Sequence, residues 1–175
     1  MRKLRTIEIK RLSIEEFKRA EKIPLVAVLD NVRSNYNVGS IFRTADAFRL
    51  EKVFLCGITG VPPSVEIHKT ALGAEDSVEW KYFSSVSKAI DTLHQEDYYV
   101  YAAEQASGSI WLEDFYIEKG KKIAVIFGNE VKGVSQEAID KCEGCIEISQ
   151  YGTKHSLNVS VAAGIVLYNI AIIIR

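Results

Sequence analysis

The sequence predicts one α/β domain, built on a mainly parallel β-sheet with helices on both faces. Two observations predict this class. Short apolar runs of strand length alternate along the chain with stretches of helical period, the order expected when crossover helices join parallel strands. Clusters of polar residues follow several of these runs, and ligand sites of α/β proteins gather at such strand ends. The length of 175 residues fits an ordinary single domain.

The first half of the chain predicts three strands and two helices. Residues 24–29, 52–58 and 78–83 form apolar runs, the second of which ends at glycines and the Pro62-Pro63 turn. A helix is expected over 84–95, with Ser84 or Ser85 as its N-cap. Another is expected over 37–48, because five apolar side chains there share one helical face. These five are Val38, Ile41, Phe42, Ala45 and Phe48.

The second half predicts strands over 98–103, 123–127 and 145–148 and a short helix over 135–142. A final helix, residues 156–174, is apolar on nearly every face from Val159 onward. It is shorter than the run of about 20 apolar residues that a membrane span needs. A helix that is apolar all round must be covered on all sides. We therefore expect it to form a homodimer contact, with a central core helix of a monomer as the alternative.

The charge is distributed unevenly. The formal net charge is −1, so the chain as a whole lacks the basic character typical of nucleic-acid binding. Residues 1–22 nevertheless hold eight basic and four acidic side chains, a local charge of +4 that leaves −5 on residues 23–175. We divide the chain accordingly into a basic N-terminal arm, residues 1–22, and a domain, residues 23–175. The arm can attract phosphates or be a solvated surface.

The cysteines and the N-terminus predict a cytoplasmic protein without membrane association. The charged N-terminus is not followed by an apolar segment of the kind found in secretion signals. The three cysteines are an odd number, which favours reduced thiols. Cys142 and Cys145 form a single C-x-x-C pair, whereas a structural zinc site needs four ligands, so no metal is expected.

The first polar cluster covers residues 30–39 and leads to Arg43. Asn37 occupies the expected N-cap position, and Gly39 allows a ligand or another backbone to approach the helix. Arg43 lies away from the apolar face, where a guanidinium could hold a phosphate or a carboxylate. The alternative is that Arg43 forms a surface ion pair with Asp46, three residues on.

The second cluster covers residues 127–135. Gly128 and Gly133 have the separation of a phosphate-binding loop, but Val134 stands where that motif needs lysine. Glu130 would also repel phosphates. A carboxylate in this turn suits recognition of a hydroxyl or a cation, or serves the N-terminus of the next helix.

The third cluster covers residues 149–158. Ser156 is the expected N-cap of the last helix, which places Asn158 in its first turn, where free N–H groups bind anions. His155 is a candidate base by residue type alone, or an ordinary surface histidine.

Together these clusters resemble the SpoU (TrmH-like) family of RNA ribose methyltransferases in the SPOUT superfamily. The resemblance covers roughly residues 24–172. It is carried by three motifs in order: Asn37-x-Gly39-x-x-x-Arg43, Gly128-Asn129-Glu130-x-x-Gly133, and the segment from Ser156 to Ala163. The resemblance implies a C-terminal deep trefoil knot, S-adenosylmethionine as the cofactor, and a homodimer formed through the last helix. It also implies an RNA substrate, with transfer RNA favoured over ribosomal RNA.

The resemblance assigns roles to individual residues. The polar catalytic set would be Arg43, Asn37, Glu130, Ser156 and Asn158. The cofactor contacts would be Gly128, Ile148, Leu157, Ala103, Glu104, Phe127, Asn129, Ser149 and Gln150. The family commonly has proline after the last strand, where this chain has Ser149. A proline would stiffen that loop, so the difference bears on cofactor affinity.

The expected reaction is methyl transfer to a ribose 2′-hydroxyl. Arg43 would anchor the phosphate beside the acceptor ribose or accept its proton. The phosphate role is favoured, because a guanidinium loses its proton only at very high pH. Three alternatives stay open: methylation of a base nitrogen, an inactive relative that only binds RNA, and a nucleotide-phosphate binder that uses residues 128–133.

Overall fold

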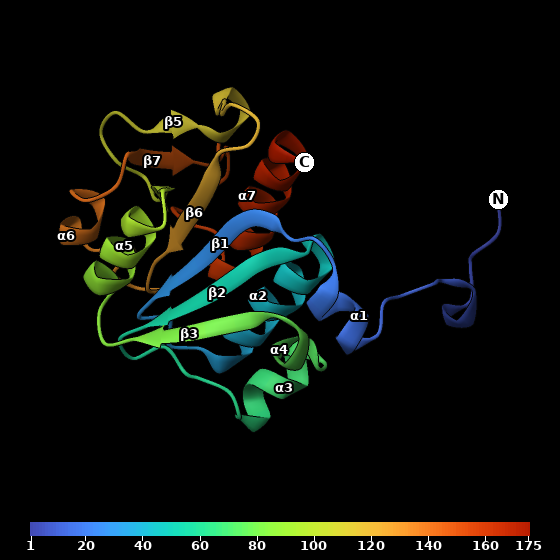
Figure 1. The fold of residues 1–175 in the computed structure, drawn as a ribbon. Helices are drawn as coiled ribbons and strands as arrows, with labels where there is room; N and C mark the ends of the chain where they lie inside the picture. Colours follow the sequence, from blue (N-terminus) through green and yellow to red (C-terminus); the bar gives the residue numbers. More distant parts are fainter.

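The computed structural model describes the backbone of residues 1–175 and all side chains except that of Thr6. Seven strands form one sheet in the order β3-β2-β1-β6-β4-β7-β5, and every pairing in it is parallel (Figure 1). The strands are β1 (Ile23–Asp30), β2 (Leu50–Cys56), β3 (Glu79–Phe83), β4 (Tyr98–Ala103), β5 (Ile110–Trp111), β6 (Lys122–Phe127) and β7 (Gly144–Glu147).

Helices cover both faces of the sheet, as the sequence predicts. Successive side chains of a strand point to opposite faces, and in β1 Ala27 and Leu29 join one core cluster while Val26 and Val28 join another. The first cluster is covered by α1 (Ile14–Arg19), α2 (Asn35–Phe48), α3 (Val65–Ala71), α4 (Ala74–Ser77) and α7 (Val159–Ile174). The second is covered by α5 (Val86–Gln95) and α6 (Gln136–Ile139). The predicted α/β class is therefore confirmed.

Several local predictions need correction. The N-cap of α2 is Ser34, whose hydroxyl accepts the Asn37 N–H at 3.4 Å, so Asn37 lies in the first turn. The N-cap of α7 is Asn158 and not Ser156: the Asn158 Oδ1 accepts the Ser160 N–H at 2.9 Å. Each loop holds several residues able to cap a helix, and tertiary packing decides which one does. Of the expected caps of α5, Ser85 holds the position.

The sequence did not predict several of the short elements. Strand β5 has two residues, and α1, α3 and α4 have six, seven and four, too few to show a clear period. Two further short 3₁₀ helices are η1 (Thr6–Glu8) and η2 (Leu112–Asp114). Helix α3 gives Gly39 its role, because a Cβ there would lie 2.2 Å from the Ile67 carbonyl oxygen. The backbone that approaches Gly39 is thus that of α3.

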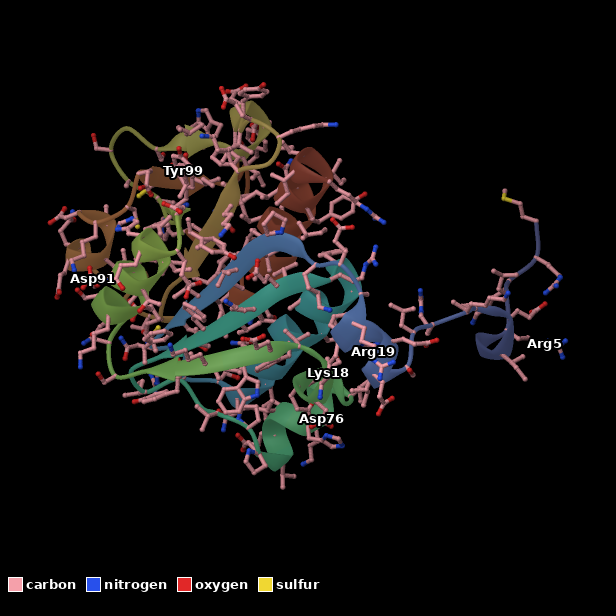
Figure 2. The ribbon with its side chains drawn as sticks, in the orientation of Figure 1. Arg5, Lys18, Arg19, Asp76, Asp91 and Tyr99 are labelled. Carbon is pink, nitrogen blue, oxygen red and sulfur yellow. The ribbon has the colours of Figure 1, made fainter. Side chains whose placement is uncertain are left out.

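The N-terminal segment leaves the body of the molecule. Residues 1–12 extend away from α1 (Figure 1), and Arg5 stands far from the sheet (Figure 2). Helix α1 is attached by Phe17, which is buried in the first core cluster. Lys18 and Arg19 lie beside α4, which carries Asp76 (Figure 2).

Helix α7 is apolar on two sides. One side is buried in the first core cluster, through residues such as Val166 and Ile170. The other side exposes a stripe with helical spacing, which we call the α7 stripe: Val161, Ile165, Tyr168 and Ile172. Among the described residues, no helix combines the length and the hydropathy that crossing a membrane requires.

Candidate active site

A cavity of about 470 Å³ lies at the carboxyl ends of three adjacent strands, β6, β4 and β7. Its walls come from residues 103–105 at the end of β4, 127–133 at the end of β6, 146–148 and Gln150 around the end of β7, and 155–159 with Ala162 at the start of α7. Parallel strands end at the same edge of the sheet, so the second and third polar clusters meet here. Eight of the nine cofactor contacts expected from the resemblance line this cavity.

The exception is Ser149, which does not line the cavity. Its hydroxyl donates a hydrogen bond to the carboxylate of Glu113 in η2. That bond lowers the pKa of Glu113, together with the Glu113 backbone N–H. The side chain therefore anchors the loop to η2, and only its neighbours Ile148 and Gln150 reach the cavity.

The glycine-rich loop after β6 is closed on itself. Asn129 and Gly133 exchange two backbone hydrogen bonds, of 3.1 and 2.8 Å. A Cβ on Gly128 would lie 2.2 Å from the Gly133 carbonyl carbon, so glycine is required by close backbone contact. The Glu104 carboxylate accepts the Val134 N–H at 2.8 Å and the Gln105 N–H at 2.9 Å, which ties the loop after β4 to this turn.

Glu130 joins this loop to the first polar cluster. Its carboxylate accepts the backbone N–H groups of Arg33 at 2.9 Å and Ser34 at 3.0 Å, and the Asn37 side-chain amide at 3.0 Å. Partial burial raises the pKa of Glu130, but these hydrogen bonds and its own N–H together outweigh burial and lower it. The carboxylate is therefore held in its ionised form.

Asn37 then connects to the third cluster. Its Oδ1 accepts a hydrogen bond from the Asn158 amide at 3.2 Å. Glu130, Asn37 and Asn158 thus form one hydrogen-bonded chain drawn from three loops. We call it the polar chain. Glu130 and Asn158 line the cavity, as does Ser156, while Asn37 lies behind them.

Arg43 stands outside this chain. It lies on the exposed side of α2, six residues after Asn37, and is not part of the cavity wall. The predicted alternative, a pair with Asp46, is wrong, because Asp46 accepts a hydrogen bond from the Ser77 hydroxyl at 2.6 Å instead. Within the part of the chain that the structure describes, the Arg43 side chain forms no hydrogen bond or ion pair.

Several residues that shape the site were given no role by the sequence analysis. Asp30 and Asn31 lie in the first cluster, at the end of β1, and Asn31 contacts the turn that carries Glu130. Gln105 donates from its amide to the His155 carbonyl oxygen at 3.1 Å and so closes one side of the cavity. An asparagine directly after an apolar strand was the available indication for Asn31.

Cys142 and Cys145 show no metal-site geometry. Burial raises the pKa of the Cys142 thiol to about 12, and the Cys142 Sγ lies 3.1 Å from the Ala138 carbonyl oxygen, to which it donates. Over the residues that the structure describes, no group of three histidine, cysteine or acidic side chains is arranged to hold a metal ion.

Known proteins share this architecture. A sequence model described as the SpoU rRNA Methylase family matches residues 24–168. A protein of Staphylococcus haemolyticus assigned to the TrmH family of tRNA/rRNA methyltransferases is 31% identical over 157 residues. That match covers 90% of this chain and 62% of the relative, so the chain spans less than two thirds of the relative's length.

Two solved structures resemble the fold. One is the AdoMet-bound rRNA methyltransferase of Sinorhizobium meliloti, with a TM-score of 0.78 and 28% identity over 87% of this chain and 58% of that one. The other is described as an RNA 2′-O ribose methyltransferase, with a TM-score of 0.74 and 25% identity over 88% of this chain and 57% of that one.

Proposed function

Because the chain belongs to the SpoU rRNA Methylase family, we propose that it transfers a methyl group from S-adenosylmethionine to a ribose 2′-hydroxyl of RNA. The observation that carries the proposal is the polar chain of Glu130, Asn37 and Asn158 at the mouth of a cavity of cofactor size. The solved relatives support it, one through its AdoMet and the other through its described 2′-O ribose activity.

The cavity residues fit this cofactor. Phe127, Ile146, Ile148 and Leu157 supply apolar wall for the adenine ring, and backbone groups at Gly128 and Gln150 can bind its polar edge. Glu104, Glu130 and Glu147 make the lining acidic, which suits a ligand that carries a sulfonium and an amino group. When bound, S-adenosylmethionine supplies an electrophilic methyl group. Ala103 and Asn129 complete the proposed contacts, whereas Ser149 lies outside the cavity wall.

The proposed task of the polar chain is to fix the acceptor ribose. Methyl transfer needs in-line placement of a hydroxyl, and positioning alone can remove several kcal/mol of barrier, roughly. Asn158 and Ser156 present polar groups to the cavity, and Asn37 and Glu130 hold Asn158 in place. Arg43 forms no described ion pair, so its guanidinium is available to anchor an RNA phosphate.

A labelled-methyl assay tests the proposal. The protein is incubated with radiolabelled S-adenosylmethionine and either transfer RNA or ribosomal RNA transcripts, and the products are mapped. A 2′-O-methyl group protects its own phosphodiester from alkali, which separates ribose from base products. We expect ribose methylation, with transfer RNA the better substrate. Label in a base indicates the base-nitrogen alternative, and RNA binding without label indicates an inactive relative.

The variant Arg43→Ala tests the phosphate anchor. We expect methyl transfer to fall by at least about a hundredfold, the effect of losing a charge-assisted contact to the substrate. Binding of S-adenosylmethionine, measured by calorimetry, should stay unchanged because Arg43 lies outside the cavity. Normal turnover in this variant would remove Arg43 from the mechanism.

We propose two further properties on the strength of family membership. The α7 stripe would form a homodimer interface, and the chain between β6 and α7 would be threaded as a trefoil knot. The sheet order, in which β6 is inserted between β1 and β4, is compatible with such threading. Under force, a knotted chain reaches a shorter extended length than its residue number allows, which single-molecule stretching measures. The expected location of the protein is the cytoplasm.

A further inference from the structure

Asn31 has a left-handed backbone conformation at the end of β1, where the chain turns toward the site. It follows the last residue of β1 directly and has a φ of 55°, in the left-handed region that asparagine tolerates better than most residues. Its N–H donates to the Cys56 carbonyl oxygen at 3.2 Å, in continuation of the β1–β2 ladder. The turn then brings Arg33 and Ser34 to the Glu130 carboxylate.

The Asn31 side chain is fixed on both sides. Its Nδ2 donates to the Asp30 carboxylate at 2.7 Å, and its Oδ1 accepts the Ile58 N–H at 3.1 Å. A backbone N–H can only donate, so the amide has one possible orientation. The Asn31 side chain packs closely against Gly57, because a Cβ on Gly57 would lie 2.2 Å from the Asn31 Oδ1. Asp30 itself is only 2% exposed, so the half-buried Asn31 amide is anchored to a buried carboxylate.

The Asn31 carbonyl oxygen contacts the loop after β6. It accepts a hydrogen bond from the Asn129 side-chain amide at 2.8 Å. The Asn129 Oδ1 in turn accepts the N–H groups of Val131 at 2.9 Å and Lys132 at 3.0 Å, which shapes the turn that carries Glu130. The two loops are therefore joined twice: Asn31 to Asn129, and Arg33 with Ser34 to Glu130.

From these contacts we infer that Asn31 is a positioning residue, which ties together the loops after β1, β2 and β6 and so sets the place of Glu130 at the cavity. Asn31 is not itself part of the cavity wall and forms no hydrogen bond with Glu130; it reaches the wall only through Asn129. Its role for methyl transfer rests on the proposed function, whereas its role in placing Glu130 does not.

A charge swap tests this role. Asn31→Asp sets a second carboxylate against Asp30 and should break the anchor. The double variant Asp30→Asn/Asn31→Asp restores the hydrogen bond with donor and acceptor exchanged, while the residue 31 carboxylate still accepts the Ile58 N–H. Asn31→Gly, which keeps the left-handed backbone and the carbonyl, is the second probe should Asn31→Asp fold poorly. Asp97→Gly is the matched control, since Asp97 has a φ of 62° at a turn far from the cavity.

Hydrogen exchange gives the decisive readout, because it needs no catalysis. In Asn31→Asp and Asn31→Gly, the Arg33 and Ser34 amides should exchange at least about tenfold faster, the equivalent of one hydrogen bond. Amides in the middle of β1 should keep their rates. The swapped double variant should return the Arg33 and Ser34 rates to within about threefold of the wild type, and Asp97→Gly should not change them.

Kinetics give the second readout. We expect kcat for methyl transfer to fall about tenfold in Asn31→Asp and to recover in the swap, with KM for S-adenosylmethionine changed less than about twofold. If the wild type transfers no methyl group, the proposed function fails while the exchange data still decide the role of Asn31. Unchanged Arg33 and Ser34 amides in both single variants, loss of protection throughout β1, or no recovery in the swap would overturn the inference.

Discussion

At the scale of single residues, Glu130 is the side chain that joins the loop after β6 to the start of α2. It accepts three hydrogen bonds from residues 33, 34 and 37, all of them donors to a carboxylate. Such bonds favour the charged form, and the pKa of Glu130 is accordingly lowered although burial acts against it. The ionisation of Glu130 therefore makes the stability of the fold depend on pH, in addition to its role at the site.

The variant Glu130→Gln should show this link. A carboxyl whose pKa is lower in the folded than in the unfolded state stabilises the fold above its unfolded value, near 4.5, and loses this effect as pH falls through the folded value. We expect wild type to exceed Glu130→Gln in free energy of unfolding at neutral pH, with the difference shrinking below pH 4.5. Urea unfolding at several pH values measures it, and a pH-independent difference would contradict the assignment.

Gly128 provides a second test at this scale. In Gly128→Ala the new Cβ meets backbone atoms of residues 133 and 134 at 2.2–2.3 Å, so the loop must move. We expect a loss of about 1–3 kcal/mol of stability, typical of overpacking, together with weaker binding of S-adenosylmethionine. Gly152→Ala is the control, because a Cβ there meets nothing within 4 Å. Equal behaviour of the two variants in calorimetry would show that the turn is not tightly constrained.

At the scale of elements, α7 combines a buried side with an exposed apolar side. The members of the α7 stripe are 39–59% exposed, although the helix has no charged residue before Arg175. Contiguous apolar surface of this kind is typical of a protein–protein interface. Its length and spacing suit an isologous contact with the same helix of a second copy.

The variant Ile172→Glu tests that contact. A charge buried without a partner in an interface costs roughly several kcal/mol. We therefore expect the wild type to be a dimer and Ile172→Glu to be a monomer. Tyr116→Glu is the control, since Tyr116 is 80% exposed in the loop between η2 and β6. Sedimentation velocity distinguishes the species. A wild type that sediments as a monomer, or a variant that stays dimeric, would exclude this face.

At the scale of the whole molecule, the basic side chains of the N-terminal arm lie away from the cavity. Segment 1–12 stands away from the sheet, and each of its side chains that the structure describes is exposed (Figure 1). Part of its charge is already paired, because Arg2 and Arg5 both contact Glu8, at 2.6 and 3.7 Å. Lys3, Lys10 and Arg11 form no ion pair among the described residues. They are the groups best placed to bind phosphates.

Deletion of residues 2–11 should therefore weaken RNA binding in a salt-dependent way. Each lost phosphate contact lowers the slope of log affinity against log salt by roughly 0.7–0.9. Methyl transfer at saturating RNA should persist, because the segment contributes nothing to the cavity wall. Filter binding across a salt series measures the slope. An unchanged slope would show that the arm has no part in RNA binding.

By itself, the sequence determined the elements and the segments that build the site. Short apolar runs identified six of the seven strands, because a strand of a parallel sheet with both faces covered has a nearly continuous apolar sequence. The polar residues at 30–39, 127–135 and 149–158 identified the loops, because polar clusters after buried strands have few structural uses. The resemblance to the family motifs then indicated which residues of these loops belong to the site.

Only the tertiary structure decided which of these residues meet. The bond from Asn37 to Glu130 spans 93 positions and that from Asn158 to Asn37 spans 121, and both exist because β6 lies between β1 and β4 while α7 returns beside α2. Strand order depends on non-local packing, which leaves no periodic trace in the chain. The same holds for the caps Ser34 and Asn158 and for Asn31, whose partners are distant backbone groups.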